Sequence, residues 1–386
     1  MKICMYCPIF PPAIGGPSTQ AFNLCKALVA KGKTPFVITY GKNFSMKEDD
    51  GFKVYTFRLQ YTYTPIDKVL RWFIFPFYIV YMLKKERSEI LHCHSVSVLT
   101  FISAFVAKIM GIPRVLKFAG DWVWETLSTN KLQAKNFEEI YKKSLTARFM
   151  TWIEKMGLNL FDKIWVVSEF RRGNIKSLLG SDDKVIIINN CLLLKGGGAR
   201  TWKKDDPVIV VSANRFIPHK RLAFMVQLFA EMNISNSHLT LIGGGDPKEI
   251  EIVKEAIKKF KVEDKIEILG ILPIEEVYER FSKASFYIST SIEEGFPNVF
   301  IEAMHYGLPV IATDEGGSKE LVLDKETGYM FVPANHQRVL EAMRRLATDI
   351  PLRTQMSTKA FERSKLFNLE YKVGEFITMY NNLLSE

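Results

Sequence analysis

Short apolar runs alternate with helical patterns along most of the chain. The runs that read as buried strands occupy residues 2–6, 208–212, 239–242, 286–289 and 310–313. Apolar residues at helical spacing follow the first of these runs, over residues 20–30. Because a strand, a helix and a second strand in succession form a βαβ unit, the pattern predicts an α/β fold with parallel sheets.

The length of the chain predicts two domains. It has 386 residues, of which 47% are apolar, and this is too much for one hydrophobic core of ordinary size. The glycine-rich run at residues 195–200 is the best linker candidate, so we predict one domain over residues 1–195 and a second over residues 206–368. A last helix is predicted from residue 369 to residue 384. Its apolar stripe is formed by Tyr371, Phe376, Ile377, Tyr380 and Leu384.

Two carboxylates, Glu294 and Glu302, flank a glycine turn and the start of a new helix. The strand-like run 286–289 leads into this segment. Ligands of βαβ units bind beyond the carboxyl ends of the strands, so we expect both glutamates near a ligand. Amides of the first helical turn, at Asn298 and Val299, can hold a phosphate, while Glu302 can accept hydrogen bonds from hydroxyls.

The spacing of these glutamates, with Gly-Phe-Pro-Asn between them, resembles the E-x7-E signature of retaining glycosyltransferases of family 4. The resemblance implies the GT-B fold, in which two Rossmann-like domains with parallel sheets face each other across a cleft. It implies that Glu294 contacts the donor sugar, that Glu302 contacts the ribose, and that the last helix, about residues 369–386, crosses back to the first domain. The alternative is that Glu294 is a solvated loop residue and Glu302 an acid favoured by the helix dipole.

Two basic residues, Arg215 and Lys220, follow the buried strand run 208–212. Fixed cations beyond a strand end can neutralise a diphosphate and stabilise the charge that grows on it as a glycosidic bond breaks. Their spacing is similar to the Arg-x4-Lys diphosphate clamp of the family. A solvated basic surface is the alternative interpretation.

Two glycine-rich loops are further candidates for donor binding. Gly243 and Gly244 follow the strand run 239–242, and glycine lets the backbone approach a ligand closely. A Pro-rich loop ends in Gly15 and Gly16, and it is similar to the family segment that closes over the donor diphosphate from the opposite domain. A tight turn explains the first loop equally well, and a plain Pro/Gly loop is the alternative for the second. The first loop is neither a dinucleotide fingerprint nor a Walker A loop.

Residues 90–95 resemble the strand of the acceptor domain that ends in His-x-His. In a strand, His92 and His94 face the same side, and the family places the second one at the floor of the site, near the transferred sugar. A buried histidine without chemistry is the alternative. No third His or Cys stands at ligand spacing, so no metal site is predicted. Asp121, after the strand 114–117, resembles a polar family position near the acceptor.

Charge is shared unevenly between the two halves. Residues 1–200 hold 29 Lys and Arg against 15 Asp and Glu, whereas residues 201–386 hold 23 against 27. A basic domain attracts anionic lipid headgroups or a phosphate-bearing acceptor, so an anionic membrane surface is an expected partner. No nucleic-acid motif is present, and nucleic acid is not an expected partner.

The segment 71–85 is apolar and aromatic with basic flanks. It is too short to span a membrane and has a proline in its middle. Two interpretations stay open, a helix buried in the core or an interfacial helix that docks on a bilayer.

Five cysteines without a signal peptide predict a reducing cytoplasm, with peripheral association at the inner face of the membrane as an extension. Cys4 and Cys7 are interpreted as core residues beside the first strand. No Asp-x-Asp motif occurs, which favours the metal-independent mode of the family. No cofactor is expected, because the nucleotide-sugar is a substrate.

The resemblance implies an enzyme of EC class 2.4 that transfers a hexose-type sugar from a nucleotide diphosphate to a hydroxyl of a glycan or lipid-linked acceptor, with retention. Uridine is the commoner base in the family and guanosine is the alternative. Three rivals stay open: a nucleotide-sugar 2-epimerase, a glycan phosphorylase, and a membrane-associated sugar-nucleotide binder without catalysis.

Overall fold

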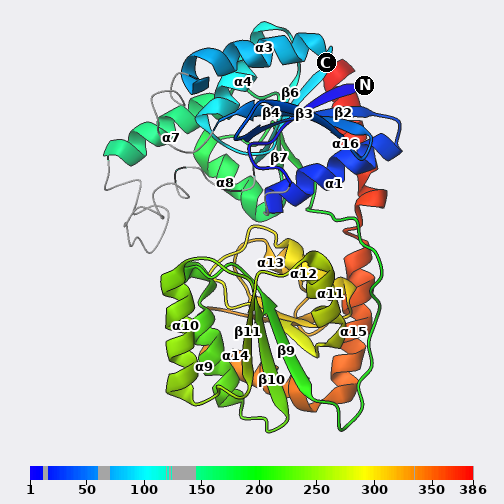
Figure 1. Cartoon of the computed structure of the whole chain (residues 1–386). Coiled ribbons are helices and arrows are strands. Elements are labelled where there is room, and N and C mark those ends of the chain that lie inside the picture. Colours follow the sequence, from blue (N-terminus) through cyan, green and yellow to red (C-terminus); the bar gives the residue numbers. More distant parts are fainter. Residues whose placement is uncertain are drawn as a thin grey trace. The chain divides into compact units, whose positions relative to one another are not determined.

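The structure is a computed structural model that describes residues 1–11, 16–59, 70–118, 120, 123, 145–333 and 335–385. The chain divides into two compact units (Figure 1). Unit 1 comprises Met1–Asn189 and Leu369–Glu386, and unit 2 comprises Asn190–Asn368. The glycine run that the sequence suggested as a linker belongs to unit 2. Gly197 packs so closely that a Cβ there would lie 2.4 Å from the carbonyl oxygen of His305.

A sheet of eight described strands forms the centre of unit 1, in the order β3-β4-β2-β1-β5-β6-β7-β8. Neighbouring strands are parallel, except that β3 pairs antiparallel with β4 at one edge. The chain leaves β1 toward β2 and later returns to β5 on the other side of β1. The strands are β1 Lys2–Tyr6, β2 Thr34–Gly41, β3 Ser45–Asp49, β4 Phe52–Arg58, β5 Ile90–Cys93, β6 Arg114–Phe118, β7 Lys163–Val166 and β8 Val185–Ile187.

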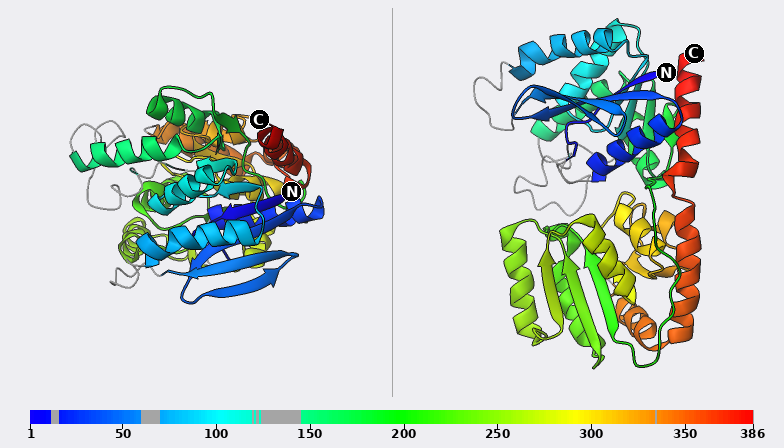
Figure 2. Two further views of the ribbon diagram at one scale, coloured as in Figure 1. Left: turned by 90° about the horizontal axis from the view of Figure 1, so that it is seen from above. Right: turned by 45° about the vertical axis from the view of Figure 1, so that its right-hand side comes forward.

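Helices cover this sheet, and right-handed crossovers put α1 on the face opposite to α3, α4 and α7. The last helix, α16, lies beside α1, and α4 lies between α3 and α7 (Figure 2). The helices are α1 Gly16–Ala30, the π-helix η1 Leu70–Ile74, α3 Phe75–Lys85, α4 Val98–Ile109, α7 Leu145–Leu158, α8 Glu169–Leu179 and α16 Leu369–Ser385. None of the described helices is long and apolar enough to cross a bilayer.

Helix α16 packs against the rest of unit 1 through aromatic contacts. The ring of Phe376 lies 4.8 Å from that of Trp165, and Tyr380 is fully buried. The predicted apolar stripe is therefore correct in its middle. It is wrong at its ends, because Tyr371 is 77% exposed and Leu384 is 43% exposed.

Unit 2 is built on a sheet in which every neighbouring pair of described strands is parallel, in the order β11-β10-β9-β12-β13-β14. The chain starts at the central β9, moves outward through β10 and β11, and returns to β12 on the other side of β9. This reversal is a topological switch point, and it lies between β9 and β12. The strands are β9 Val208–Ala213, β10 Ser237–Ile242, β11 Ile266–Gly270, β12 Phe286–Ile288, β13 Val310–Thr313 and β14 Gly328–Phe331.

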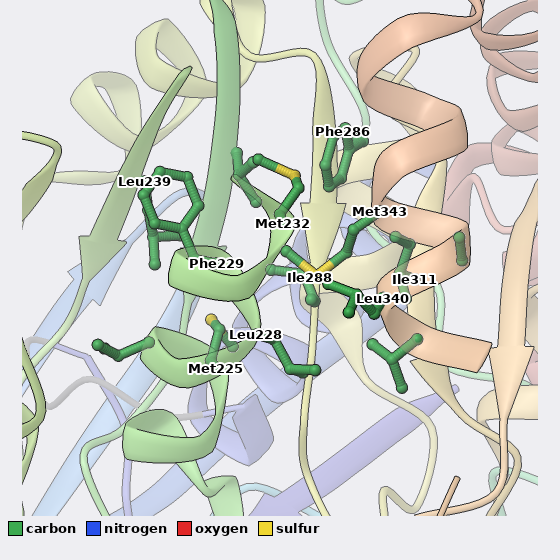
Figure 3. Packing of buried hydrophobic residues seen from close by; sticks show 14 of the residues in the cluster. Met225, Leu228, Phe229, Met232, Leu239, Phe286, Ile288, Ile311, Leu340 and Met343 are labelled. Carbon is green, nitrogen blue, oxygen red and sulfur yellow. The ribbon is translucent and has the colours of Figure 1, made fainter. Parts of the chain in front are cut away.

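The core of unit 2 fixes the strands whose ends form the candidate site. Figure 3 shows Phe229 beside Leu239, Met225 beside Leu228, and Met343 near Ile288. Burial of such side chains contributes about 1.5–3 kcal/mol each. The helices are η2 Pro218–Lys220, α9 Leu222–Met232, α10 Pro247–Phe260, α11 Ile274–Lys283, α12 Asn298–His305, α13 Ser318–Leu321, α14 His336–Thr348 and α15 Ile350–Lys365.

The cysteines are all unpaired and buried, including Cys4 and Cys7. Burial raises the pKa of the Cys7 thiol to about 12, so it stays protonated at neutral pH. This confirms their interpretation as core residues.

Candidate active site

A buried ion pair joins the loops that follow the two central strands of unit 2. Lys220 ends η2, beyond β9, and its ammonium donates to Oε1 of Glu294 in the loop after β12. The two side chains are only 10% and 14% exposed. Because β9 and β12 flank the switch point, the pair lies where ligands of such sheets bind. The fold thus brings two of the predicted site residues into direct contact.

Hydroxyl groups from strand ends hold this carboxylate in place. Ser291 Oγ donates to Oε1 of Glu294 at 2.7 Å. Thr313, at the end of β13, donates to the carbonyl oxygen of Ser291 at 2.7 Å, and Thr290 donates to that of Lys220 at 2.8 Å. The position of the carboxylate is therefore set by the ends of the strands as well as by its own loop.

The loop after β13 packs against the backbone of Glu294. The amide of Gly317 donates to the Glu294 carbonyl oxygen at 2.8 Å. A Cβ at Gly316 would lie 2.1 Å from that same oxygen, and Gly316 has a φ of 69°. Only glycine adopts this conformation at this distance without strain.

The glycine turn after β10 lies against the loop after β9. The amide of Phe216 donates to the carbonyl oxygen of Gly244 at 2.9 Å. A Cβ at Gly243 would lie 1.9 Å from the carbonyl oxygen of Asn214. The turn is thus beside the backbone of Arg215. Arg215 is exposed, and its side chain makes no hydrogen bond or ion pair with the part of the chain that the structure describes.

Helix α12 begins at the same edge of the sheet, just after the Glu294 loop. Its first residue is Asn298, preceded by Pro297, and no side chain caps this end. Asn298 and Val299 are half-buried in the first turn, where helix amides lack helical partners. The end of α12 can therefore receive an anion.

Glu302 lies one turn further along α12, beside two tyrosines. Tyr278 of α11 donates to Oε1 of Glu302 at 3.4 Å, and its ring stacks on Tyr306 at a centroid distance of 5.1 Å. Although the residue as a whole is only half-buried, burial of its carboxyl group raises the pKa to about 7, and the bond from Tyr278 opposes this rise. The carboxyl group therefore titrates near neutral pH.

In unit 1, two histidines lie side by side in the core at the end of β5. The rings of His92 and His94 are 4.3 Å apart and fully buried, which confirms that they share a face. Nδ1 of His92 lies 2.6 Å from the hydroxyl of Tyr380, and neither ring nitrogen of His94 has a hydrogen-bond partner among the described residues. Burial, and also the nearby Lys117, lower both pKa values, that of His92 to about 3. Both rings are therefore neutral at pH 7.

The remaining candidates of unit 1 are only partly described. Gly16 is the exposed first residue of α1. Gly15 and Asp121 lie outside the described residues.

Sequence reasoning missed the residues that support the two glutamates. Ser291 carries only a local signal, because it stands three positions before Glu294 and is therefore close to it along the chain. Tyr278 carries none, because it reaches Glu302 from another helix. Tyr287 is equally hidden, a buried strand residue whose hydroxyl donates to the Ala213 carbonyl oxygen at 3.0 Å.

Two family models match this chain. The model described as Glycosyl transferases group 1 matches residues 199–363, within unit 2, and the model described as Glycosyltransferase Family 4 matches residues 14–192, almost all within unit 1. The chain belongs to this family of glycosyltransferases, and its two parallel-sheet units are those of the GT-B fold.

Known proteins are similar to this chain in sequence or in fold. The chain is 24% identical over 332 residues to one of the subunits of human phosphatidylinositol N-acetylglucosaminyltransferase, a match that spans 83% of this chain and 63% of that protein. Sucrose-phosphate synthase from Thermosynechococcus elongatus has a TM-score of 0.80 at 21% identity, with 100% of both chains covered. Anabaena HepE in complex with UDP has a TM-score of 0.74 at 16% identity, with 99% of this chain and 100% of that chain covered.

The ion pair predicts strong coupling between its partners. We expect Lys220→Met and Glu294→Gln each to lower the free energy of unfolding by about 3 kcal/mol, because each leaves a partner buried without its counter-charge. The double variant should lose less than the sum, as measured by urea unfolding in a double-mutant cycle. The matched control is the exposed pair Lys359 and Glu326, for which we expect little coupling. Additive losses at 220 and 294 would contradict a direct pair.

Glu302 predicts a stability that depends on pH. Its pKa is raised in the folded state, so protonation stabilises the fold, and this contribution is lost as the pH rises from about 4.5 through about 7. As the pH rises from 5 to 8, the free energy of unfolding of Glu302→Gln should therefore increase relative to that of wild type, by at most about 3 kcal/mol. Thermal unfolding at both pH values measures the effect, and an equal difference at the two would contradict the raised pKa.

Proposed function

We propose that this chain transfers a hexose-type sugar from a nucleotide diphosphate donor, UDP rather than GDP, to an acceptor hydroxyl with retention of configuration. The observation that carries the proposal is the edge of the unit 2 sheet at its switch point. There the buried pair of Lys220 and Glu294, the exposed cation of Arg215 and a helix start without a side-chain cap follow the ends of two neighbouring strands, β9 and β12.

In this proposal the donor diphosphate occupies the positive side of that edge. Arg215 and Lys220 bind its oxygens, and Gly243, Gly244 and the first amides of α12 allow close approach of the backbone. Negative charge grows on the diphosphate as the bond from the anomeric carbon to its phosphate oxygen breaks. Cations held in place before the reaction stabilise that charge without a cost of reorganisation.

The two glutamates bind the two sugars of the donor. Glu302, once ionised, accepts hydrogen bonds from the ribose hydroxyls, and Glu294 accepts them from the transferred sugar. Lys220 and Ser291 orient Glu294 and keep it from acting as a nucleophile. The acceptor oxygen forms the new bond on the face that the diphosphate leaves, and its proton passes to a phosphate oxygen. We propose that no metal ion and no cofactor take part.

The preference for UDP rests on the relatives. HepE is described in complex with UDP, and a pneumococcal O-GlcNAc transferase of similar fold is described in complex with UDP and GlcNAc. GDP is the alternative.

We propose a lipid-linked or glycan acceptor, because the human relative's name designates phosphatidylinositol as its target. On the acceptor side we assign His94 a place near the transferred sugar. Its ring is neutral and its nitrogens lack partners among the described residues. The ring can therefore donate a hydrogen bond to a sugar hydroxyl or accept one from it.

Asp121 is kept as a further candidate on the acceptor side, and Gly15 and Gly16 are kept as candidates for donor contact. We also propose cytoplasmic action at the inner face of a membrane.

Arg215 provides the sharpest test. Arg215→Ala should lower kcat with a UDP-sugar about 10²–10³-fold, because it removes one fixed donor to the leaving group, and it should weaken UDP binding in a thermal-shift titration. Arg280→Ala on α11 is the matched control, since it removes an equally exposed arginine away from this edge. Equal activity of the two variants would contradict the assignment.

The products separate this proposal from its rivals. Transfer with retention gives an α-linked product from an α-linked donor by NMR, and added EDTA should leave the rate unchanged. An isomerised sugar nucleotide from donor alone would instead identify an epimerase, and a sugar phosphate released from a glycan a phosphorylase. UDP binding without turnover on any acceptor would identify a binding protein.

A further inference from the structure

Three helices of unit 1 expose aromatic and aliphatic side chains at helical spacing. On η1 and α3 these residues are Phe73, Phe77 and Tyr81, which are 67%, 75% and 57% exposed. Residues four apart share one face of a helix, so the three form a single stripe. The π-turn of η1 leads directly into α3, and Trp72 and Ile74 next to the stripe are also exposed.

Helices α4 and α7 carry stripes of the same kind. On α4 the residues are Phe105 and Ile109, which are 53% and 71% exposed. On α7 the exposed residues are Leu145, Phe149, Trp152 and Met156. The rings of Phe149 and Trp152 stack at a centroid distance of 5.9 Å, so part of this stripe is preformed.

These stripes lie opposite to the faces that build the core. On α3 the buried residues are Phe75, Ile79, Met82 and Leu83, and on α4 they include Ala104 and Ala107. The segment 71–85 therefore has a core side, as one of the two interpretations from the sequence expects, and an outer side of exposed aromatic residues. The outer side needs a separate explanation, because the core does not use it.

The three stripes belong to one surface. Helix α4 contacts α3 on one side and α7 on the other, and both views of Figure 2 show the three helices next to one another on the same side of unit 1. Exposed apolar residues that are scattered singly are normal, whereas a contiguous set on neighbouring helices marks an interaction site. We call this set the three-helix surface, and its residues are Trp72, Phe73, Ile74, Phe77, Tyr81, Phe105, Ile109, Leu145, Phe149, Trp152 and Met156.

The charges on these helices all have one sign at the surface. The exposed residues on them that are charged at neutral pH are basic: Lys84, Lys85, Lys108, Arg148 and Lys155, together with the half-buried Arg71. The only acidic residue in η1, α3, α4 and α7 is Glu154, which is fully buried. A partner of this surface must therefore be apolar and carry negative charge at its rim.

We propose that the three-helix surface docks on a lipid bilayer that contains anionic headgroups. Aromatic and aliphatic side chains enter the boundary between headgroups and acyl chains, while Lys and Arg at their edges bind the headgroups. Each basic residue near such a surface raises affinity about fivefold. A folded protein partner fits less well, because protein interfaces are depleted of lysine, and four of the six basic residues here are lysines.

This inference goes beyond the proposed transfer reaction and does not need it. It identifies which face of unit 1 binds the membrane, and it assigns a shared role to α4 and α7, which the sequence did not single out. It is tested without any measurement of catalysis, so failure of docking and failure of sugar transfer are separate outcomes.

The test is flotation of the full chain with vesicles of phosphatidylcholine alone and with 30% phosphatidylglycerol. We expect binding to the mixed vesicles at about 100 mM salt, and binding at least tenfold weaker to pure phosphatidylcholine. A variant with Phe77→Ser, Phe105→Ser, Phe149→Ser and Trp152→Ser should lose binding to the mixed vesicles. The replaced side chains are exposed, so thermal stability and UDP binding should stay close to those of wild type.

Two further variants make the result specific. A variant with Lys84→Ser, Lys108→Ser and Lys155→Ser should lose most of its preference for phosphatidylglycerol and keep weak apolar binding. The matched control carries Tyr371→Ser, Ile271→Ser and Ile252→Ser, which removes equally exposed apolar residues from other helices and loops, and should bind like wild type.

Three results would overturn the proposal. One is no flotation of the wild type with either vesicle, and another is equal flotation of the four-residue variant and the control. The third is a dimer by light scattering that the four-residue variant abolishes, because the surface would then be a contact between two copies of this chain.

Discussion

The ion pair between Lys220 and Glu294 is the constraint on which the arrangement of the candidate site depends. A charge that is removed from water is stable only when a counter-charge and hydrogen bonds are supplied, and Ser291 completes the set around this carboxylate. The pair also joins the loop after β9 to the loop after β12. A diphosphate that enters meets a lysine that is already positioned, so little ordering remains when charge develops on the leaving group.

The two glutamates differ because their surroundings differ. Glu294 faces a lysine, whereas Glu302 faces two tyrosines and has no cation beside it among its described partners. Burial therefore raises the pKa of Glu302, and its charge depends on pH in the range where cells operate. A carboxyl group that binds hydroxyls can work with a charge that depends on pH, because it becomes a better hydrogen-bond acceptor as it ionises. In unit 1 burial also favours the neutral form of His94, but because a histidine is charged when protonated, its pKa is lowered instead of raised.

Much of this could be predicted from the sequence, and the failures have physical causes. Strand runs followed by glycine or basic loops located Arg215, Lys220, Gly243 and Glu294, because ligands bind at strand ends. The contact between Lys220 and Glu294 could not be predicted from local pattern, since it depends on β9 and β12 being neighbours although 74 positions separate the two residues. Periodicity identified α16, whereas the segment 71–85 was marked only by its apolar and aromatic composition. It could not tell that Tyr371 and Leu384 are exposed or that α4 and α7 extend the α3 surface, because periodicity within one helix carries no information on its neighbours.

The most direct test of the central claim is a crystal structure of the chain with UDP bound. The account predicts that the diphosphate oxygens lie within hydrogen-bond distance of Arg215 and Lys220, with the ribose hydroxyls at Glu302. A nucleotide bound away from the carboxyl ends of β9 and β12, with the pair of Lys220 and Glu294 untouched, would contradict it.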